Sequence, residues 1–405
     1  MSTARRWLSR SFLVLLLSFV AVAALWAHGR LTSPTPAQVA ALETMRAPVD
    51  GAEGENGFER LAALPAHADP TRWPACQAGM PCLERVEANP VAFAQALAPI
   101  ANDLDEAERV LRAPRFVDPR PAVAIDDAGP SFDAVAALDA RRALDFVSGR
   151  RAEALAAACT DATDALRWVR RPDSLLHAMI GGAVFRDTAW LIGEMRARDP
   201  AVPLPAACAP LMDVPDPATE GAACAMLAAE WRHRQRVMPA MEAKARGGGL
   251  SGLLQPVLHD GRWLAARSAE RFATACGAAG AEAARADRLP TLSAPPRRGV
   301  DHVAFPLSIG LDGLEAPAYG VYIERLLDHA ARRRLLAAGL RMGAMDPAMA
   351  GTARFEALPE ALRGGPRPLA FDARNGTLLV PMRGPQTHLP TGAVAEERLP
   401  IPVMP

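Results

Sequence analysis

The sequence predicts a mainly α-helical protein with an N-terminal transmembrane helix, an irregular multi-helix domain and a small C-terminal β-hairpin. Three observations lead to this prediction. Residues 12–27 form an apolar run, alanine-rich amphipathic stretches fill the middle of the chain, and alternating apolar residues flank Asn375-Gly376. Alanine has the highest helix propensity, and Asn-Gly between alternating segments is a strong hairpin signal.

The apolar run at 12–27 contains one polar residue, Ser18. As a helix it would cover about 24 Å, somewhat less than the hydrocarbon layer of about 30 Å, although flanking residues can extend it. Arg5, Arg6 and Arg10 precede the run. Because positive charge stays on the cytoplasmic side, everything beyond residue 30 is expected to be exported.

Both retention and cleavage of this segment are compatible with its sequence. A signal peptide needs a small-x-small triplet after its apolar run. The triplet 21–23 lies inside the run, and a cut after Ala27 would place Leu25 at an unsuitable position. Trp26 suits the membrane interface. An uncleaved anchor, with the lipid bilayer as partner of residues 12–27, is therefore favoured over a cleaved signal peptide and over a buried core helix.

Helix signals recur along the exported part. Thr35 and Gln38 form a capping box, and residues 172–199 are apolar on most of their surface, which is typical of a core helix. Within that helix Glu194 and Arg198 stand four residues apart and are expected to pair. The predicted helices lie within 35–47, 55–64, 90–98, 102–112, 131–147, 150–171, 172–199, 219–245, 263–283 and 317–343.

The C-terminal part changes character. Residues 368–382 predict the hairpin, residues 302–308 are a candidate third strand, and the Pro-rich tail is expected to be loose. The chain thus divides into five segments: 1–30, a cytoplasmic stub with the anchor or signal peptide; 31–130, short helices and Pro-rich connections; 131–345, a helical core domain; 346–384, the β-hairpin segment; and 385–405, the tail.

Six cysteines in an exported chain predict disulfides, with buried free thiols as the alternative. Spacing alone leaves 15 pairings open. Local context favours a bridge between Cys76 and Cys82 across a Gly- and Pro-containing loop, and one that closes the Pro-rich stretch after Cys208. The expected set is Cys76–Cys82, Cys208–Cys224 and Cys159–Cys276.

Charge argues against nucleic acid as a partner. The chain has 45 basic and 45 acidic side chains, and four arginines fall within residues 1–30, so the exported part is slightly acidic. Nucleic-acid-binding proteins usually carry a basic excess. The densest basic cluster, Arg332-Arg333-Arg334 with Arg341, lies on an expected helix and is interpreted as a solvated face.

Common catalytic signatures are missing from the sequence: there is no His-Glu-x-x-His zinc motif, no phosphate-binding loop and no nucleophile elbow. In "GGGLSGLL", Ser251 lacks the spacing of an elbow, and the glycines read as a hinge. His177 is interpreted as a core histidine. His259 in "HDGRW" and His302 in "DHVAF" adjoin turn-forming aspartates. We therefore predict no catalytic residue, cofactor site or metal site.

Several stretches in this order resemble a group of proteobacterial membrane-anchored envelope proteins without an assigned activity. They are the arginine-flanked anchor, "ENGFERLAAL", a cysteine pair, "SLLHAMIGGAVFRDTAWL", "LLQP" and "LPEALRGGPRPLAFDARNGTLLVP". The resemblance implies the membrane topology and no catalytic residues.

Together these observations favour a single-pass inner-membrane protein with most of its chain in the periplasm, where it binds a protein or another envelope component without being an enzyme. The main alternative is an envelope hydrolase that acts on peptidoglycan or peptides with catalytic groups from distant segments, which would show a cleft of titratable side chains. A carrier of a small ligand, with one enclosed apolar pocket, is a weaker alternative.

Overall fold

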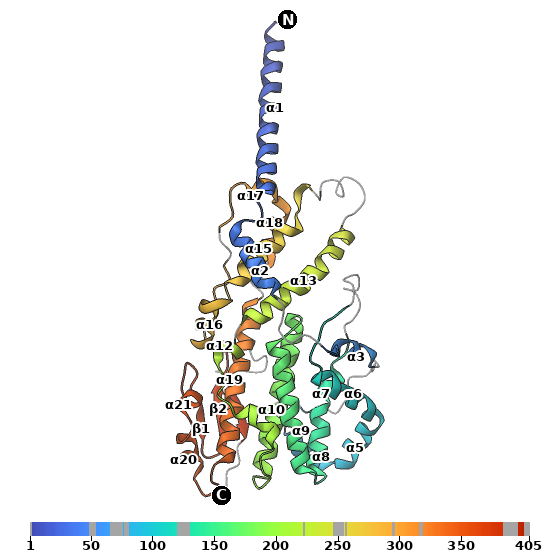
Figure 1. Cartoon of the computed structure of the whole chain (residues 1–405), viewed down its shortest axis with the longest axis vertical. Coiled ribbons are helices and arrows are strands. Elements are labelled where there is room, and N and C mark those ends of the chain that lie inside the picture. The colour runs from blue at the N-terminus through green and yellow to red at the C-terminus, as the bar shows by residue number, and fades with distance from the viewer. Residues whose placement is uncertain are drawn as a thin grey trace.

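A single long helix projects from one end of a mainly helical body in the computed structural model of the chain (Figure 1). A small antiparallel sheet lies toward the opposite end. The helical class and the C-terminal sheet predicted from sequence are thereby confirmed. The structure describes residues 2–47, 54–64, 76, 81–119, 130–221, 223–245, 255, 257–293, 296–315, 319–383 and 396–400.

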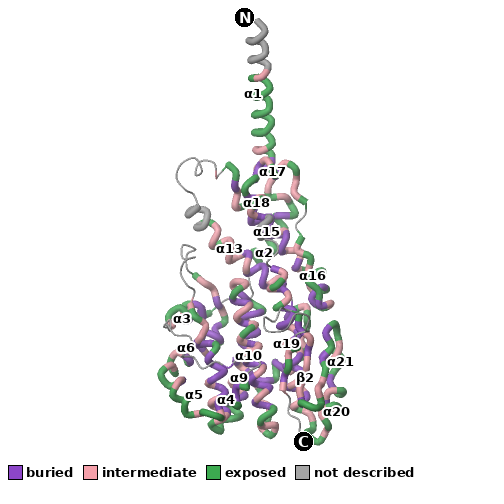
Figure 2. Tube along the Cα trace, turned by 180° about the vertical axis from the view of Figure 1, so that it is seen from behind, coloured by how far each residue is buried: buried purple, intermediate pink, exposed green. Residues whose placement is uncertain are grey.

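The projecting helix is α1 (Ser2–Leu31). Its segment Ser11–Leu31 is long and apolar enough to cross a bilayer, and no other described helix meets that criterion. Side chains from residues 12 to 25 are exposed, whereas Gly29 is buried against the body (Figure 2). Among the described side chains of the helix, those of the apolar stretch are therefore exposed, and the C-terminal end packs against the body.

Five helices form the part of the body nearest to α1. They are α2 (Pro36–Arg46), α13 (Ala223–Ala245), α15 (Gly261–Ala273), α17 (Asp301–Ala304) and α18 (Pro306–Glu315). The expected capping box at the start of α2 is confirmed, because Thr35 Oγ1 accepts from the Gln38 amide and the Gln38 side chain accepts from the Thr35 amide. Apolar residues of α2, α13 and α15, such as Met45, Leu227 and Phe272, share one buried cluster.

The main core lies farther from α1. There α9 (Arg151–Arg170) and α10 (Leu175–Arg198) pack closely along each other, flanked by α8 (Leu138–Val147) and α19 (Tyr319–Ala344). Gly181 permits the approach, because a Cβ there would come within 2.8 Å of the Cβ of Trp168. Figure 2 shows many buried residues along α9, α10 and α19.

Shorter helices complete the body. The expected helix at 263–283 is in fact two helices, α15 and α16, with a break between them. The remaining helices are α3 (Gly57–Ala63), α4 (Cys82–Ala88), α5 (Pro90–Leu97), η2 (Ala98–Ile100), α6 (Ala101–Arg112), α7 (Asp133–Ala136), η4 (Ala206–Cys208), α11 (Ala209–Met212), α12 (Pro217–Glu220), α16 (Gly277–Arg285), α20 (Gly351–Glu356) and α21 (Glu360–Arg363).

The expected ion pair between Glu194 and Arg198 is not formed. The Glu194 carboxylate accepts hydrogen bonds from the amides of Cys82 and Leu83 at the start of α4, and Arg198 pairs with Glu87 at 2.6 Å. Helix N-termini offer free N–H groups that favour a carboxylate. A partner on a neighbouring helix therefore displaces the one on the same helix.

The sheet contains β1 (Ala370–Asp372), β2 (Thr377–Pro381) and β3 (Glu396–Pro400), in the order β1-β2-β3. The hairpin around Asn375-Gly376 is confirmed, with Phe371 opposite Leu378. The prediction of a strand at 302–308 is wrong, since these residues belong to α17 and α18. The third strand, β3, comes instead from the tail that was expected to be loose.

The cysteines form three disulfides: Cys76–Cys82, Cys159–Cys208 and Cys224–Cys276. The first was expected, whereas the pairs Cys208–Cys224 and Cys159–Cys276 are wrong. Cys159 lies on α9, and η4 with Cys208 packs directly against that helix. A disulfide requires Cα atoms about 4.4–6.8 Å apart, and the observed partners are 4.9 and 4.8 Å apart. Spatial neighbours across the fold thus replace the partners chosen by sequence context.

Candidate functional site

The candidate functional site is the junction between α1 and the body, where several polar and close apolar contacts join the apolar helix to the rest of the chain. Gly29 faces α17 so closely that a Cβ there would lie 2.6 Å from the Cβ of Ala304 and 3.1 Å from a methyl group of Val300. Non-bonded carbon atoms normally stay about 3.5–4.0 Å apart. The absence of a side chain at Gly29 is therefore a condition for this contact.

Two side chains on α1 bind the segment 257–260. The indole N–H of Trp26 donates to the carbonyl of Val257 at 3.0 Å. The guanidinium of Arg30 donates to the carbonyls of Val257 and His259 at 3.0 and 3.3 Å, and it lies 3.5 Å from the carboxylate of Asp260. Hydrogen bonds to charged groups are the stronger kind. The final turns of α1 are thus fixed to the body in one orientation.

Two stacked aromatic side chains of the body lie next to Arg30 at the same junction. Phe305 stacks on Trp263 with ring centroids 5.1 Å apart, and both are buried. The guanidinium of Arg30 also lies over the rings of Trp26 and Phe305, at 4.8 and 5.4 Å. Cations are attracted to aromatic faces at such distances. Next to it Arg298 donates to the carbonyl of Thr32 at 3.2 Å, which secures the chain where α1 ends.

The junction contains one serine–histidine contact. Ser308 Oγ lies 2.9 Å from His259 Nδ1 and accepts from the amide of Asp260 at 2.9 Å. Such a contact could activate a nucleophile if a substrate reached it. Ser308 is fully buried, however, and its oxygen already binds the Asp260 amide. The arrangement therefore serves as a link that holds α18 against the segment bound by α1.

The turn chemistry predicted around the two His/Asp pairs is confirmed. Asp260 caps α15 by accepting from the amides of Arg262 and Trp263. Asp301 accepts from the amide of Arg298 at 3.0 Å. His302, next to it, is exposed. Both aspartates thus fix backbone turns beside the junction.

A buried carboxylate holds the helices behind the junction. Asp312 on α18 pairs with Arg271 on α15 and with Arg297 at 2.9 Å, and Arg267 lies 3.8 Å away. A buried carboxylate needs such partners, because removal from water is costly otherwise. The network joins α15 to α18 in the part of the body that contacts the end of α1.

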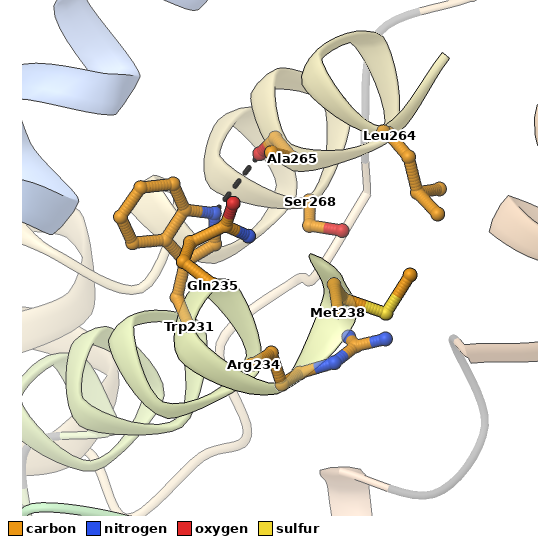
Figure 3. A pocket seen from close by; sticks show the side chains of 8 residues that line it. Trp231, Arg234, Gln235, Met238, Leu264, Ala265 and Ser268 are labelled. Atoms are coloured by element: carbon orange, nitrogen blue, oxygen red, sulfur yellow. Dashed lines mark hydrogen bonds between the residues drawn. The ribbon is translucent and has the colours of Figure 1, made fainter. Parts of the chain in front are cut away.

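A depression between α13 and α15 lies close to this region (Figure 3). Trp231 lies along its wall and donates its indole N–H to the carbonyl of Ala265 at 2.9 Å. Its cavity volume is about 10 Å³, roughly the space of one water molecule. A second depression, between Trp190 and Arg332, is of the same size. Neither has room for an organic ligand in this conformation.

His177 lies in the core, as its sequence context predicts. It stacks on Phe116 with ring centroids 4.1 Å apart, and its Nδ1 accepts from the amide of Asp173. Burial lowers the pKa of His177 to about 3. Ser174 caps α10, and the Asp173 carboxylate pairs with Arg236. The three side chains therefore form no catalytic relay.

Two other buried groups were missed from sequence. Burial raises the pKa of Asp139 well above its usual range, helped by the nearby charge of Asp187, although Thr188 donates to it at 2.9 Å. His329 is buried, and neither of its ring nitrogens has a hydrogen-bond partner within the described chain. Burial and nearby arginines lower the pKa of His329 to about 3. Neither group lines the two depressions described above.

The interpretation of the arginine cluster on α19 as a solvated face is wrong. Arg333 is buried and donates to the carbonyls of Pro210 and Leu211, both at 2.6 Å. Arg341 donates to the next carbonyl, that of Met212, and Arg334 donates to the carbonyl of Gly364. Carbonyls at helix ends attract cations. These arginines therefore fasten two loops to α19 from inside the body.

Arg367 has a similar role beneath the sheet. It pairs with the buried carboxylates of Asp287, at 2.7 Å, and Asp328. Arg383 also binds Asp287, at 2.8 Å. This network attaches the C-terminal segment to α19.

Ser251 and the neighbouring glycines 247–249 lie outside the described residues. Among the side chains that the structure does describe, no group of three or more His, Cys, Asp or Glu residues is placed to hold a metal ion.

Comparison with known proteins adds no assignment to this geometry. No family model matches the chain, and neither a curated protein nor a solved structure resembles it significantly.

Proposed function

We propose that this protein is a single-pass inner-membrane protein whose uncleaved α1 holds the helical body in the periplasm, where the body binds a protein or another envelope component. The attachment of α1 through Trp26, Gly29 and Arg30 is the observation that supports the anchor best. A disposable leader has no need of contacts with the folded body, whereas a permanent anchor gains a fixed orientation from them.

The position of these contacts bears on cleavage. A cut after Ala27 would remove the Trp26 indole that binds Val257. The triplet at 21–23 lies in the middle of α1, within its regular helix. Retention of the helix keeps the whole junction intact.

The compartment follows from charge and redox chemistry. Arginines precede the apolar segment, which favours export of the body. Three disulfides favour an oxidising compartment, because thiols stay reduced in the cytosol. The resemblance to proteobacterial envelope proteins agrees with this topology and is part of the same proposal.

Binding is favoured over catalysis by the character of the surface. The two delineated depressions each hold about one water, and pockets for small molecules are usually several hundred Å³. The hydrolase alternative calls for a cleft of titratable side chains from distant segments, and the serine–histidine contact at the junction is not accessible to a substrate because Ser308 is buried. Recognition through an open surface makes no such demand.

Anchor retention is tested with the full chain carrying one epitope before residue 1 and another after residue 405. Both epitopes on one band, in membranes that resist alkaline carbonate, are expected. A soluble periplasmic species without the first epitope would overturn retention. A reporter that is active only in the periplasm, fused after residue 60, should give signal, and activity of a cytoplasm-only reporter there would overturn the topology.

Binding is tested by photo-cross-linking in whole cells. A photoreactive residue is placed at exposed apolar positions that lie away from α1: Val91, Leu176, Val214 and Val321. At least one discrete protein or glycan adduct is expected. Adducts at none of the four positions would contradict binding, and release of soluble fragments from purified peptidoglycan by the detergent-solubilised protein would favour the hydrolase.

A further inference from the structure

Four exposed apolar side chains lie on the segments that meet where α1 joins the body. Leu31 is 86% exposed, Val257 44%, Leu258 38% and Leu307 47%. They come from the end of α1, the segment 257–260 and the first turn of α18, which lie together at the α1 end of the molecule (Figure 1). We name this group the apolar collar.

We propose that the apolar collar is immersed in the interfacial layer of the same bilayer that α1 crosses, so that the body rests on the membrane instead of hanging from a free tether. This inference rests on the proposed anchor and adds a second membrane contact to it. The occupant of the collar is lipid, because the collar lies where the exposed apolar stretch of α1, residues 12–25, reaches the body, and Trp26 at that point is bonded to Val257 of the collar.

Depth along α1 is the first argument. The apolar run 12–27 would occupy most of a hydrocarbon layer of about 30 Å, so the end of the segment Ser11–Leu31 extends into the interfacial layer. Trp26 lies five residues before Leu31 and so about 7.5 Å inside that end. Since its indole binds the carbonyl of Val257 at 3.0 Å, Val257 must lie near the same depth. A body attached at this point cannot stay clear of the lipid.

The polar groups at this depth are the second argument. Unpaired polar groups are costly in lipid. Here the Trp26 N–H binds a carbonyl, and the Arg30 guanidinium binds two carbonyls and the carboxylate of Asp260. Tryptophan is also enriched at membrane interfaces. The junction therefore brings its own hydrogen-bond partners into the interface.

The charged side chains near the collar can reach the headgroups. Arg262 is exposed, and Arg298 is half-buried with its guanidinium on Thr32 and Asp301. Long arginine side chains keep their apolar stems in lipid while the charge extends to water. The surroundings of the collar thus fit a shallow position and exclude a deep one.

The test measures immersion depth with the full chain in vesicles of phosphatidylcholine and phosphatidylglycerol. One cysteine at a time is introduced by Leu258→Cys, Leu307→Cys, Leu16→Cys or Val91→Cys and labelled with a nitroxide, without reduction of the native disulfides. Val91 is the matched control, because it is an exposed aliphatic residue on α5, at the opposite end of the body (Figure 2). Leu16 reports the span itself.

Collision rates with oxygen and with a water-soluble nickel chelate give the depth of each label. Labels at 258 and 307 are expected to show at least a threefold higher oxygen-to-nickel ratio than the label at 91. Equal ratios at 258, 307 and 91, with a lipid-like ratio at 16, would overturn the collar and leave the anchor standing. A water-like ratio at 16 would overturn the anchor and the collar together.

Discussion

Gly29→Ala gives a sharp test of the junction, because it adds one carbon where none fits. The new Cβ would lie 2.6 Å from the Cβ of Ala304, so α1 must retreat by about 1 Å to reach an ordinary contact distance. That movement stretches the 3.0 Å bonds of Trp26 and Arg30 to Val257 to about 4 Å, beyond hydrogen-bonding distance.

The expected magnitude depends on how α1 responds. If α1 stays docked, overpacking costs about 1–3 kcal/mol; if α1 retreats, each lost bond of the Arg30 guanidinium costs about 1.5–3 kcal/mol, and the less costly of the two responses sets the effect. A net weakening of the α1–body contact by about 1–3 kcal/mol corresponds to roughly a 5- to 150-fold fall in the docked-to-undocked ratio.

Hydrogen–deuterium exchange of the full chain in lipid nanodiscs measures this ratio. Amides in residues 257–265 should exchange roughly tenfold faster or more in Gly29→Ala, because undocking exposes them. The matched control is Gly310→Ala on α18, where an added Cβ meets no atom within 4 Å; its exchange should be unchanged. Equal protection of residues 257–265 in the wild type and in Gly29→Ala would refute the close-contact argument.

Three further predictions concern buried ionisable side chains. Arg367→Met should lower the free energy of unfolding by about 3 kcal/mol, since the buried carboxylates of Asp287 and Asp328 both lose the Arg367 guanidinium while Asp287 keeps Arg383. The exposed Arg374→Met should change it by less than about 0.5 kcal/mol; thermal unfolding of both variants checks this, and equal effects would contradict it. The pKa of Asp139 is raised in the folded protein, so folding favours the protonated form of this side chain. Its contribution to the free energy of unfolding is therefore complete below about pH 3.9, the pKa in the unfolded chain, and is lost as the pH rises through the folded pKa. Asp139→Asn should therefore be more stable relative to wild type at pH 7 than at pH 4, and a difference independent of pH would refute this. The pKa of His329, lowered to about 3, makes the wild type lose stability as the pH falls from about 6.5 toward 3; His329→Leu should lose less between pH 7 and pH 5, and an unchanged acid dependence of the melting temperature would rule the histidine out as the cause.

Local features were predictable because their causes lie within a few residues. The capping box of Thr35 and Gln38 needs only a spacing of three, and the Asn375-Gly376 turn needs only its flanking strands. The class of the fold follows from the sum of such signals. The same is true of the N-terminal apolar helix, which is defined by composition and length.

Features that depend on which segments meet were not predictable. The bridge from Cys159 to Cys208 requires η4 to pack on α9, and β3 requires the tail to return to β2. The burial of arginines on α19 was missed, although the sequence contains a signal for it. Successive helical residues point about 100° apart, so Arg332 to Arg334 cannot all face water on a helix packed on several sides.

The junction was visible from sequence only in part. Trp26 suggested an interface, but its partner Val257 lies 231 residues away, and nothing in the local pattern points to it. Gly29 has no side chain from which a contact could be inferred. A glycine followed by arginine at the end of an apolar helix is the signal that could have drawn attention to it.

The distance in sequence between α1 and its partners has a consequence for biogenesis. Arg30 binds residues 227 to 230 positions later, so at about 5–20 residues per second these partners are synthesised some 10–50 s after the first helix. During that interval α1 is present without the residues that it contacts in the folded body. The contacts of Trp26 and Arg30 with residues 257–260 therefore form late. A product truncated before residue 257 would keep α1 in the membrane but lack these contacts, so the rest of its chain would not be held in a fixed orientation relative to α1.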